Sequence, residues 1–100
     1  MPAYKKKIAV KGKSSKELYD KIASGIDYFL GKYPLGKHEV SRDASGQKVH
    51  LKSSMVTLEL RCLEGEIHIE GSLSLVAMAI RGKLDEGIDR WIAKTFGNSA

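Results

Sequence analysis

The stretch that decides the fold is residues 66–96, which read EIHIEGSLSLVAMAIRGKLDEGIDRWIAKTF. Its first residues alternate apolar and polar side chains, which is typical of a strand with one buried face. From residue 76 onward apolar residues recur every three or four positions, which is typical of an amphipathic helix. The stretch therefore predicts a strand, a short linker at residues 72–75 and one helix over residues 76–96.

A weaker copy of this strand and helix stands at the front of the chain. Residues 7–12 alternate in the same way, and the helix predicted over residues 14–33 has one apolar stripe. The stripe consists of Leu18, Ile22, Ile26, Phe29 and Tyr33. Gly25 and Gly87 occupy the same position when the two helices are aligned. Because glycine inside a helix costs about 1 kcal/mol relative to alanine, we expect a close approach at this position.

The ends of both helices carry recognisable signals. Ser14 and Glu17 have the spacing of a capping box, in which each side chain binds a backbone N–H of the other. Pro34 and Gly36 are expected to stop the first helix, because proline cannot continue the hydrogen-bond ladder. Gly97 is expected to end the second helix, and residues 98–100 to form a frayed tail.

Between the helices, residues 37–71 have a period of two. Strands are predicted at residues 38–42, 48–52, 56–63 and 66–70, with turns at residues 44–46 and at Glu64-Gly65. Each clear strand has one apolar and one charged face, which is typical of an antiparallel sheet covered on a single side. We therefore predict an α+β fold, with a single antiparallel β-sheet, two α-helices packed on one face and the order β-α-β-β-β-β-α over one domain, residues 1–100.

Composition places the chain among ordinary globular proteins. Of its 100 residues 42% are hydrophobic and 29% are charged. No apolar run approaches the ~20 residues that span a bilayer, and the N-terminus has no apolar secretory core. Cys62 is the single cysteine, so no intrachain disulfide can form. We expect a cytoplasmic protein without a membrane span.

The positive charge is concentrated in the first half. Residues 1–52 carry a net +7 and residues 53–100 a net −2, which gives the formal +5 of the chain. A surface of this kind can contact phosphates or another anionic partner, or it can simply be solvated. The candidate contacts for an anionic partner are Lys5, Lys6, Lys7, Lys11, Lys13 and Lys16.

No cofactor, metal site or catalytic group is predicted. The three histidines His38, His50 and His68 lack the close paired spacing of a zinc site. By alternation Cys62 points into the core, whereas His50 and His68 point outward, so these side chains would not converge. We therefore expect a non-enzymatic protein.

The open face of the sheet is the other candidate surface. Acidic residues Glu59 and Glu70 share it with basic residues, which predicts charge pairing between neighbouring strands. The same face could be the interface of a homodimer. The candidate interface residues are Lys48, His50, Glu59, Arg61 and His68.

Three aromatic residues on the predicted helices are candidate surface groups. Trp91 lies on the apolar stripe of the second helix, so we expect it in the core. Tyr19 and Tyr28 lie beside the stripe of the first helix, where a partly exposed tyrosine can serve an interface, stack on a base or merely flank the helix.

Residues 73–94 resemble the C-terminal signature of the polyhydroxyalkanoic acid system proteins, a family of small bacterial proteins. In that family a leucine–proline turn leads into a helix of the form F-[RK]-x-x-I-E-x-x-I. The corresponding residues here are Leu73, Ile80, Arg81, Leu84, Asp85 and Ile88, with Ser74 in place of proline. The resemblance implies binding to the surface of a polyhydroxyalkanoate granule or to a granule-associated protein, and it implies no catalytic residue.

A second resemblance leads to a different partner. Residues 65–68, GEIH, stand before the last helix as in ribosome hibernation factors, which share a basic charge and a β-α-β-β-β-α order. That resemblance implies binding to RNA or the ribosome. In this chain the basic N-terminal half would make the contacts, because the second helix mixes cations with Asp85, Glu86 and Asp89.

Overall fold

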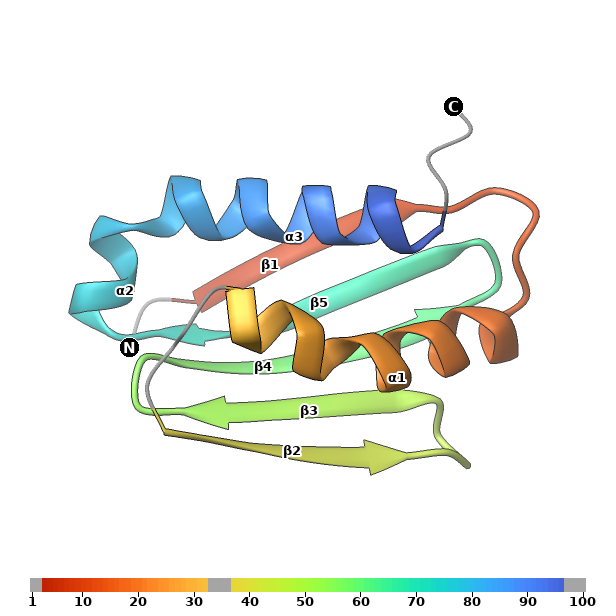
Figure 1. The fold of residues 1–100 in the computed structure, drawn as a ribbon, viewed down its shortest axis with the longest axis horizontal. Helices are drawn as coiled ribbons and strands as arrows, with labels where there is room; N and C mark the ends of the chain where they lie inside the picture. The colour runs from red at the N-terminus through yellow and green to blue at the C-terminus, as the bar shows by residue number, and fades with distance from the viewer. Residues whose placement is uncertain (1–2, 33–36, 97–100) are drawn as a thin grey trace.

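The strands of the chain form one antiparallel sheet, and the helices pack against one face of it (Figure 1). This computed structural model describes residues 3–32 and 37–96. Within them the elements are β1 (Ala3–Ala9), α1 (Ser15–Lys32), β2 (His38–Asp43), β3 (Lys48–Ser53), β4 (Val56–Leu63), β5 (Glu66–Leu73), α2 (Leu75–Ala79) and α3 (Arg81–Thr95). The predicted α+β class and single antiparallel sheet are confirmed.

The sheet has the strand order β1-β5-β4-β3-β2, and each pair of neighbours is antiparallel. Strands β2 to β5 follow one another as hairpins, whereas β1 crosses to the far side of β5. Helix α1 makes this connection, and it lies across β3 and β4 on the covered face. The turn at Glu64-Gly65 forms the predicted hairpin between β4 and β5.

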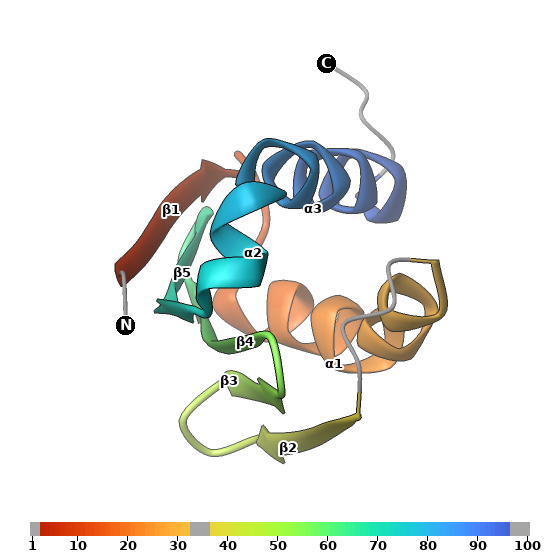
Figure 2. The same cartoon turned by 90° about the vertical axis from the view of Figure 1, so that its left-hand side faces the viewer.

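Figure 2 shows the sheet on one side and the helices α1 and α3 on the other, and the core of apolar side chains lies between them. Alternation along the strands supplies one half of this layer, and the stripes of α1 and α3 supply the other. The strand residues are Val49, Leu51, Val56, Leu58, Leu60, Cys62, Ile67, Ile69 and Leu73. The helix residues are Leu18, Tyr19, Ile22, Ile26, Phe29, Leu30, Ala77, Leu84, Ile88, Trp91 and Ile92. The predicted core positions of Cys62 and Trp91 are confirmed.

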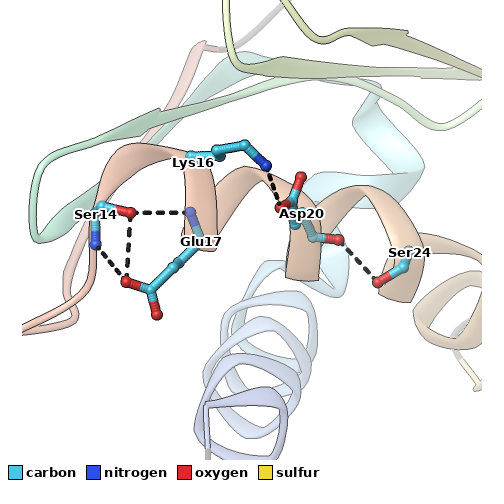
Figure 3. Close-up of polar contacts among 5 residues, drawn as sticks. All are labelled: Ser14, Lys16, Glu17, Asp20 and Ser24. Atoms are coloured by element: carbon cyan, nitrogen blue, oxygen red, sulfur yellow. Dashed lines mark hydrogen bonds and ion pairs between the residues drawn. The ribbon is translucent and has the colours of Figure 1, made fainter.

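The predicted capping box opens α1 (Figure 3). The Glu17 N–H donates to Ser14 Oγ at 3.2 Å, and the Ser14 N–H donates to Glu17 Oε1 at 3.3 Å. Two of the N–H groups that a helix start leaves without partners are thereby bonded. The expected helix ends at Pro34, Gly36 and Gly97, and the expected tail at residues 98–100, lie outside the described residues.

The predicted close approach at Gly25 is also confirmed. A Cβ placed on Gly25 would lie 3.2 Å from Nε1 of Trp91, so α1 and α3 come together where the glycine leaves room for the indole. The rings of Phe29 and Trp91 pack beside this point with centroids 4.9 Å apart. Gly87 is buried in α3.

One prediction about the elements is wrong, because the expected single helix over residues 76–96 is two helices. Ser74 Oγ accepts from the Ala77 N–H at 3.1 Å and caps α2, which ends at Ala79. Ile80 leaves helical geometry with φ −112° and ψ 19°, and its N–H donates to Ala77 O at 3.1 Å. The chain therefore turns at Ile80, and the stripe of α3 begins at Leu84 and does not include Ile80.

Candidate functional site

The open face of the sheet carries charged side chains in rows that run across the strands. Register places Lys7 beside His68, His68 beside Arg61, and Arg61 beside Lys48. The next row along the strands contains Lys5, Glu70, Glu59, His50 and Ser41. The five predicted interface residues therefore lie together on three neighbouring strands, β3, β4 and β5.

Charge pairing between these rows occurs as predicted. Glu59 and Glu70 stand directly opposite each other on β4 and β5, where two carboxylates repel. Arg61 reaches back to both of them, with Nη2 3.2 Å from Glu59 Oε2 and 3.7 Å from Glu70 Oε2. His50 Nε2 lies 3.6 Å from the other oxygen of Glu59. The side chains of opposite sign thus hold each other in place.

The open face has no excess of one charge. Within the described strands its basic residues are Lys5, Lys7, Lys48, Lys52 and Arg61, and its acidic residues are Glu39, Asp43, Glu59, Glu66 and Glu70. Phosphate binding is driven by clustered cations. A balanced face of this kind suits a polar protein surface better than a nucleic-acid backbone.

The six lysines predicted to contact an anionic partner do not form one patch. Lys5 and Lys7 point to the open face, whereas Lys6 points to the covered face because it has the same phase as the buried Tyr4. The side chain of Lys6 is only 18% exposed, and its ammonium lies 3.1 Å from Asp89 and 3.7 Å from Asp85. Lys6 thus binds α3 and faces away from Lys5 and Lys7.

Most of the remaining lysines have carboxylate partners as well. Lys7 lies 4.0 Å from Glu66, Lys13 lies 3.8 Å from Glu17, and Lys16 lies 3.1 Å from Asp20, the last drawn in Figure 3. In the part of the chain that the structure describes, Lys5 and Lys11 have no ion pair. The charge of this region is therefore largely compensated at the surface.

Sequence reasoning did not identify a polar cluster between β1 and α3. The Tyr4 hydroxyl donates a hydrogen bond to Asp85 Oδ1, and the Arg81 guanidinium lies 5.9 Å from the centre of the Tyr4 ring. Burial, with the Asp85 contact second, raises the pKa of Tyr4 above its usual value. Two features of the sequence point to this cluster. Tyr4 falls on the same face of its strand as Ile8, and Arg81, Asp85 and Asp89 follow one another at intervals of four residues, which places them on one face of a helix.

An exposed apolar surface on α2 was also unforeseen. The side chains of Leu75 and Val76 are 82% and 67% exposed, and Ile80 at the turn is 36% exposed. Ala77 is fully buried and anchors the helix to the sheet. We call Leu75, Val76 and Ile80 the α2 apolar surface. Such a surface is what a binding site for another apolar surface requires.

Cys62 is unsuited to act as a nucleophile. Burial raises the pKa of its thiol to about 11, so the thiol stays protonated at neutral pH. The described residues contain no group of three or more histidine, cysteine or acidic side chains that could hold a metal ion. The described helices include none whose length and hydropathy would let it cross a membrane.

Comparison with known proteins supports the fold and leaves the family open. No protein-family model matches the chain, and no curated protein matches it. The fold is similar to the crystal structure of a TBP-like protein from Parabacteroides distasonis, with a TM-score of 0.58 and 14% sequence identity over 70% of this chain and 53% of that protein. This chain thus spans about half the length of that protein. The resemblances to polyhydroxyalkanoic acid system proteins and to ribosome hibernation factors stay predictions.

Proposed function

We propose that this protein is a small, non-enzymatic bacterial accessory protein that binds the surface of polyhydroxyalkanoate granules. The main support for the proposal is the α2 apolar surface, in which Leu75 and Val76 are largely exposed to water. This surface lies inside residues 73–94, the part of the sequence that resembles the granule-associated family. The same segment therefore supplies both the resemblance and an apolar contact.

Helix α2 stands at one end of the molecule (Figure 1), and its side chains Leu75 and Val76 are largely exposed there. The Ser74 cap and the buried Ala77 hold the short helix in place, which lowers the entropy lost on binding. Full burial of a leucine or valine side chain contributes about 1.5–3 kcal/mol.

The proposal is tested by co-sedimentation with purified granules. The variant Leu75→Gln/Val76→Gln keeps the net charge and removes the two most exposed apolar groups. We expect its affinity for granules to fall at least about tenfold, since 1.4 kcal/mol corresponds to a factor of ten. The matched control is Lys21→Gln/Lys83→Gln, which changes two exposed helical residues and leaves the α2 apolar surface intact.

Two results would contradict the proposal. The wild-type protein could remain in the supernatant in the presence of granules, or the lysine control could lose as much binding as the α2 variant. The second result would mean that charge and not apolar contact drives the association. Circular dichroism of both variants shows whether they keep the wild-type fold.

The RNA or ribosome hypothesis and the homodimer hypothesis have less support. Of the six lysines in the first, Lys6, Lys7, Lys13 and Lys16 are paired with carboxylates. The RNA or ribosome hypothesis is tested by using ribosomes in place of granules in the same co-sedimentation assay. It predicts that the protein binds ribosomes and that this binding weakens steeply as the salt concentration rises. The homodimer hypothesis is tested by light scattering at micromolar protein concentration, which distinguishes a monomer from a dimer.

A further inference from the structure

The two long helices enclose a cleft on the side of the molecule away from the sheet. Figure 2 shows α1 and α3 next to each other on this side. The cleft has a volume of about 260 Å³. It is lined by Tyr28, Phe29, Lys32, Arg90, Trp91 and Lys94. Its walls therefore combine three cations with three aromatic rings and contain no carboxylate.

The cations of this cleft are uncompensated, unlike most of the six N-terminal lysines, of which Lys6, Lys7, Lys13 and Lys16 have carboxylate partners. Within the described residues Lys32, Arg90 and Lys94 form no ion pair with an acidic side chain. The nearest carboxylates in sequence are engaged elsewhere, since Asp27 lies 3.4 Å from Arg42 and Asp89 lies 3.1 Å from Lys6. Three positive charges thus line one small cleft without a negative group.

Two of these cations converge on a single neutral group. Lys94 Nζ lies 3.0 Å from the Tyr28 hydroxyl oxygen, and Lys32 Nζ lies 3.5 Å from the same atom. The ammonium groups are 5.1 Å and 5.7 Å from the centre of the Tyr28 ring. Two ammonium groups that contact the same oxygen repel each other, and an anion bound between them would offset this repulsion.

The electrostatics of Tyr28 reflect this arrangement. The hydrogen bond from Lys94, followed by that from Lys32, lowers the pKa of the Tyr28 hydroxyl below its ordinary value. The same contact raises the pKa of Lys94. The two lysines therefore stabilise negative charge on the Tyr28 phenol oxygen. An external anion would compete with this oxygen for the same two ammonium groups.

We propose that the cleft between α1 and α3 binds a small phosphate-bearing molecule. Lys32 and Lys94 would contact the phosphate, Arg90 would add its planar fork of N–H donors, and Tyr28 would border the organic part. The volume lies just below the range of about 300–1,000 Å³ that is common for drug-sized ligands. A phosphate with a short organic body fits this space.

The surroundings of the cleft favour a small ligand over a nucleic acid. The neighbouring hollow along the same two helices is lined by Glu17 and Asp20 as well as by Lys13 and Lys21. A phosphate chain that left the cleft in this direction would meet carboxylates, which repel it. The positive surface of the cleft therefore ends in this direction at the acidic side chains Glu17 and Asp20.

A purely structural role for the lysines makes a different prediction. Lys32 and Lys94 each lie in the last turn of a helix, where a cation stabilises the helix dipole. If that were their only role, removing them would lower helix stability, and no ligand would shift the Tyr28 titration. The experiment therefore needs a readout at Tyr28 itself.

The test is a titration followed by NMR of protein labelled with ¹³C in its tyrosine rings, with Tyr28 assigned from the variant Tyr28→Phe. The probes are glycerol 3-phosphate and adenosine 5′-monophosphate, with glycerol and adenosine as the matched controls without phosphate. We expect only the phosphorylated probes to shift the Tyr28 resonance and to raise its pKa, because a bound phosphate competes for Lys94. Lys32→Gln/Lys94→Gln should weaken binding at least about tenfold, because it removes two charge-assisted contacts.

The control variant for this site is Lys21→Gln/Lys52→Gln, which removes two exposed lysines outside the cleft and should bind as the wild type does. The proposal is overturned if neither phosphorylated probe shifts Tyr28 at up to about 10 mM, the limit of very weak affinity. It is also overturned if both lysine variants lose binding equally, or if single-stranded RNA binds the cleft more tightly than either probe does. Granule binding is measured separately through α2, so either proposal can fail alone.

Discussion

At the scale of single residues, Tyr4 explains why the basic N-terminal strand is only partly available to a partner. Its ring is 1% exposed, and its hydroxyl donates to Asp85, eighty-one positions further along the chain. Lys6, two residues later, binds Asp85 and Asp89 from the same side of the strand. The central lysine of a run that resembles a basic patch is therefore a contact between β1 and α3.

Tyr4 also gives the protein a pH dependence with a definite sign. Its folded-state pKa is raised, mainly by burial, so the folded protein keeps this proton at pH values where the unfolded chain has lost it. The stabilisation is complete below the usual tyrosine pKa of about 10 and decreases progressively as the pH rises above it. We expect the free energy of unfolding to fall more steeply above this pH in the wild type than in Tyr4→Phe.

Urea unfolding between neutral pH and about pH 11 measures this difference. At neutral pH the variant should be less stable by about 1 kcal/mol, the net value of one hydrogen bond. The two proteins differ only at this residue, so contributions from the rest of the chain cancel in the comparison. Parallel stability curves across the whole range would show that Tyr4 does not keep its proton preferentially in the folded state.

At the scale of elements, the start of α1 is stabilised by a contact that the sequence predicts. Replacing the cap in Ser14→Ala leaves the Glu17 N–H without its partner at 3.2 Å. We expect a loss of about 1 kcal/mol in the free energy of unfolding, as for other N-caps. Ser24→Ala is the matched control, because Ser24 lies inside the helix. Its Oγ donates to Asp20 O at 2.8 Å, as drawn in Figure 3, and to Lys21 O at 3.3 Å, so it caps no N–H group.

Alanine favours helix interiors more than serine does, so the control should be neutral or slightly stabilising. Thermal and urea unfolding of the two variants would settle the comparison. Equal losses in both would mean that the Ser14 side chain does not act as a cap.

The division between α2 and α3 shows where pattern reading failed at this scale. Residues 76–96 have helical periodicity throughout, so periodicity alone cannot place a turn at Ile80. The Ser74 cap starts α2 one residue earlier, and the chain must then change direction to bring Leu84 and Ile88 over the sheet. Val76, which has the periodicity of the predicted helix, and its neighbour Leu75 consequently stay exposed to water.

At the scale of the whole molecule, one apolar layer joins the sheet to the helices, and the α2 apolar surface lies outside this layer. Trp91 is the single tryptophan, and it lies in this layer between α1 and α3. We therefore expect its fluorescence and the far-ultraviolet circular dichroism of the whole chain to report the same unfolding transition in urea. An earlier transition by fluorescence would mean that α3 leaves the sheet before the rest unfolds.

The sequence by itself determined the element types, the face of each strand that is buried, the α1 cap and the approach at Gly25. These follow from short-range periodicity and from local backbone chemistry, which residues close in the chain control. Only the tertiary structure decided that Lys6 binds Asp89, that Tyr4 binds Asp85, and that three cations border the α1–α3 cleft. These contacts depend on strand register and helix crossing, which long-range packing sets, so no local pattern in residues 66–96 or elsewhere could predict them.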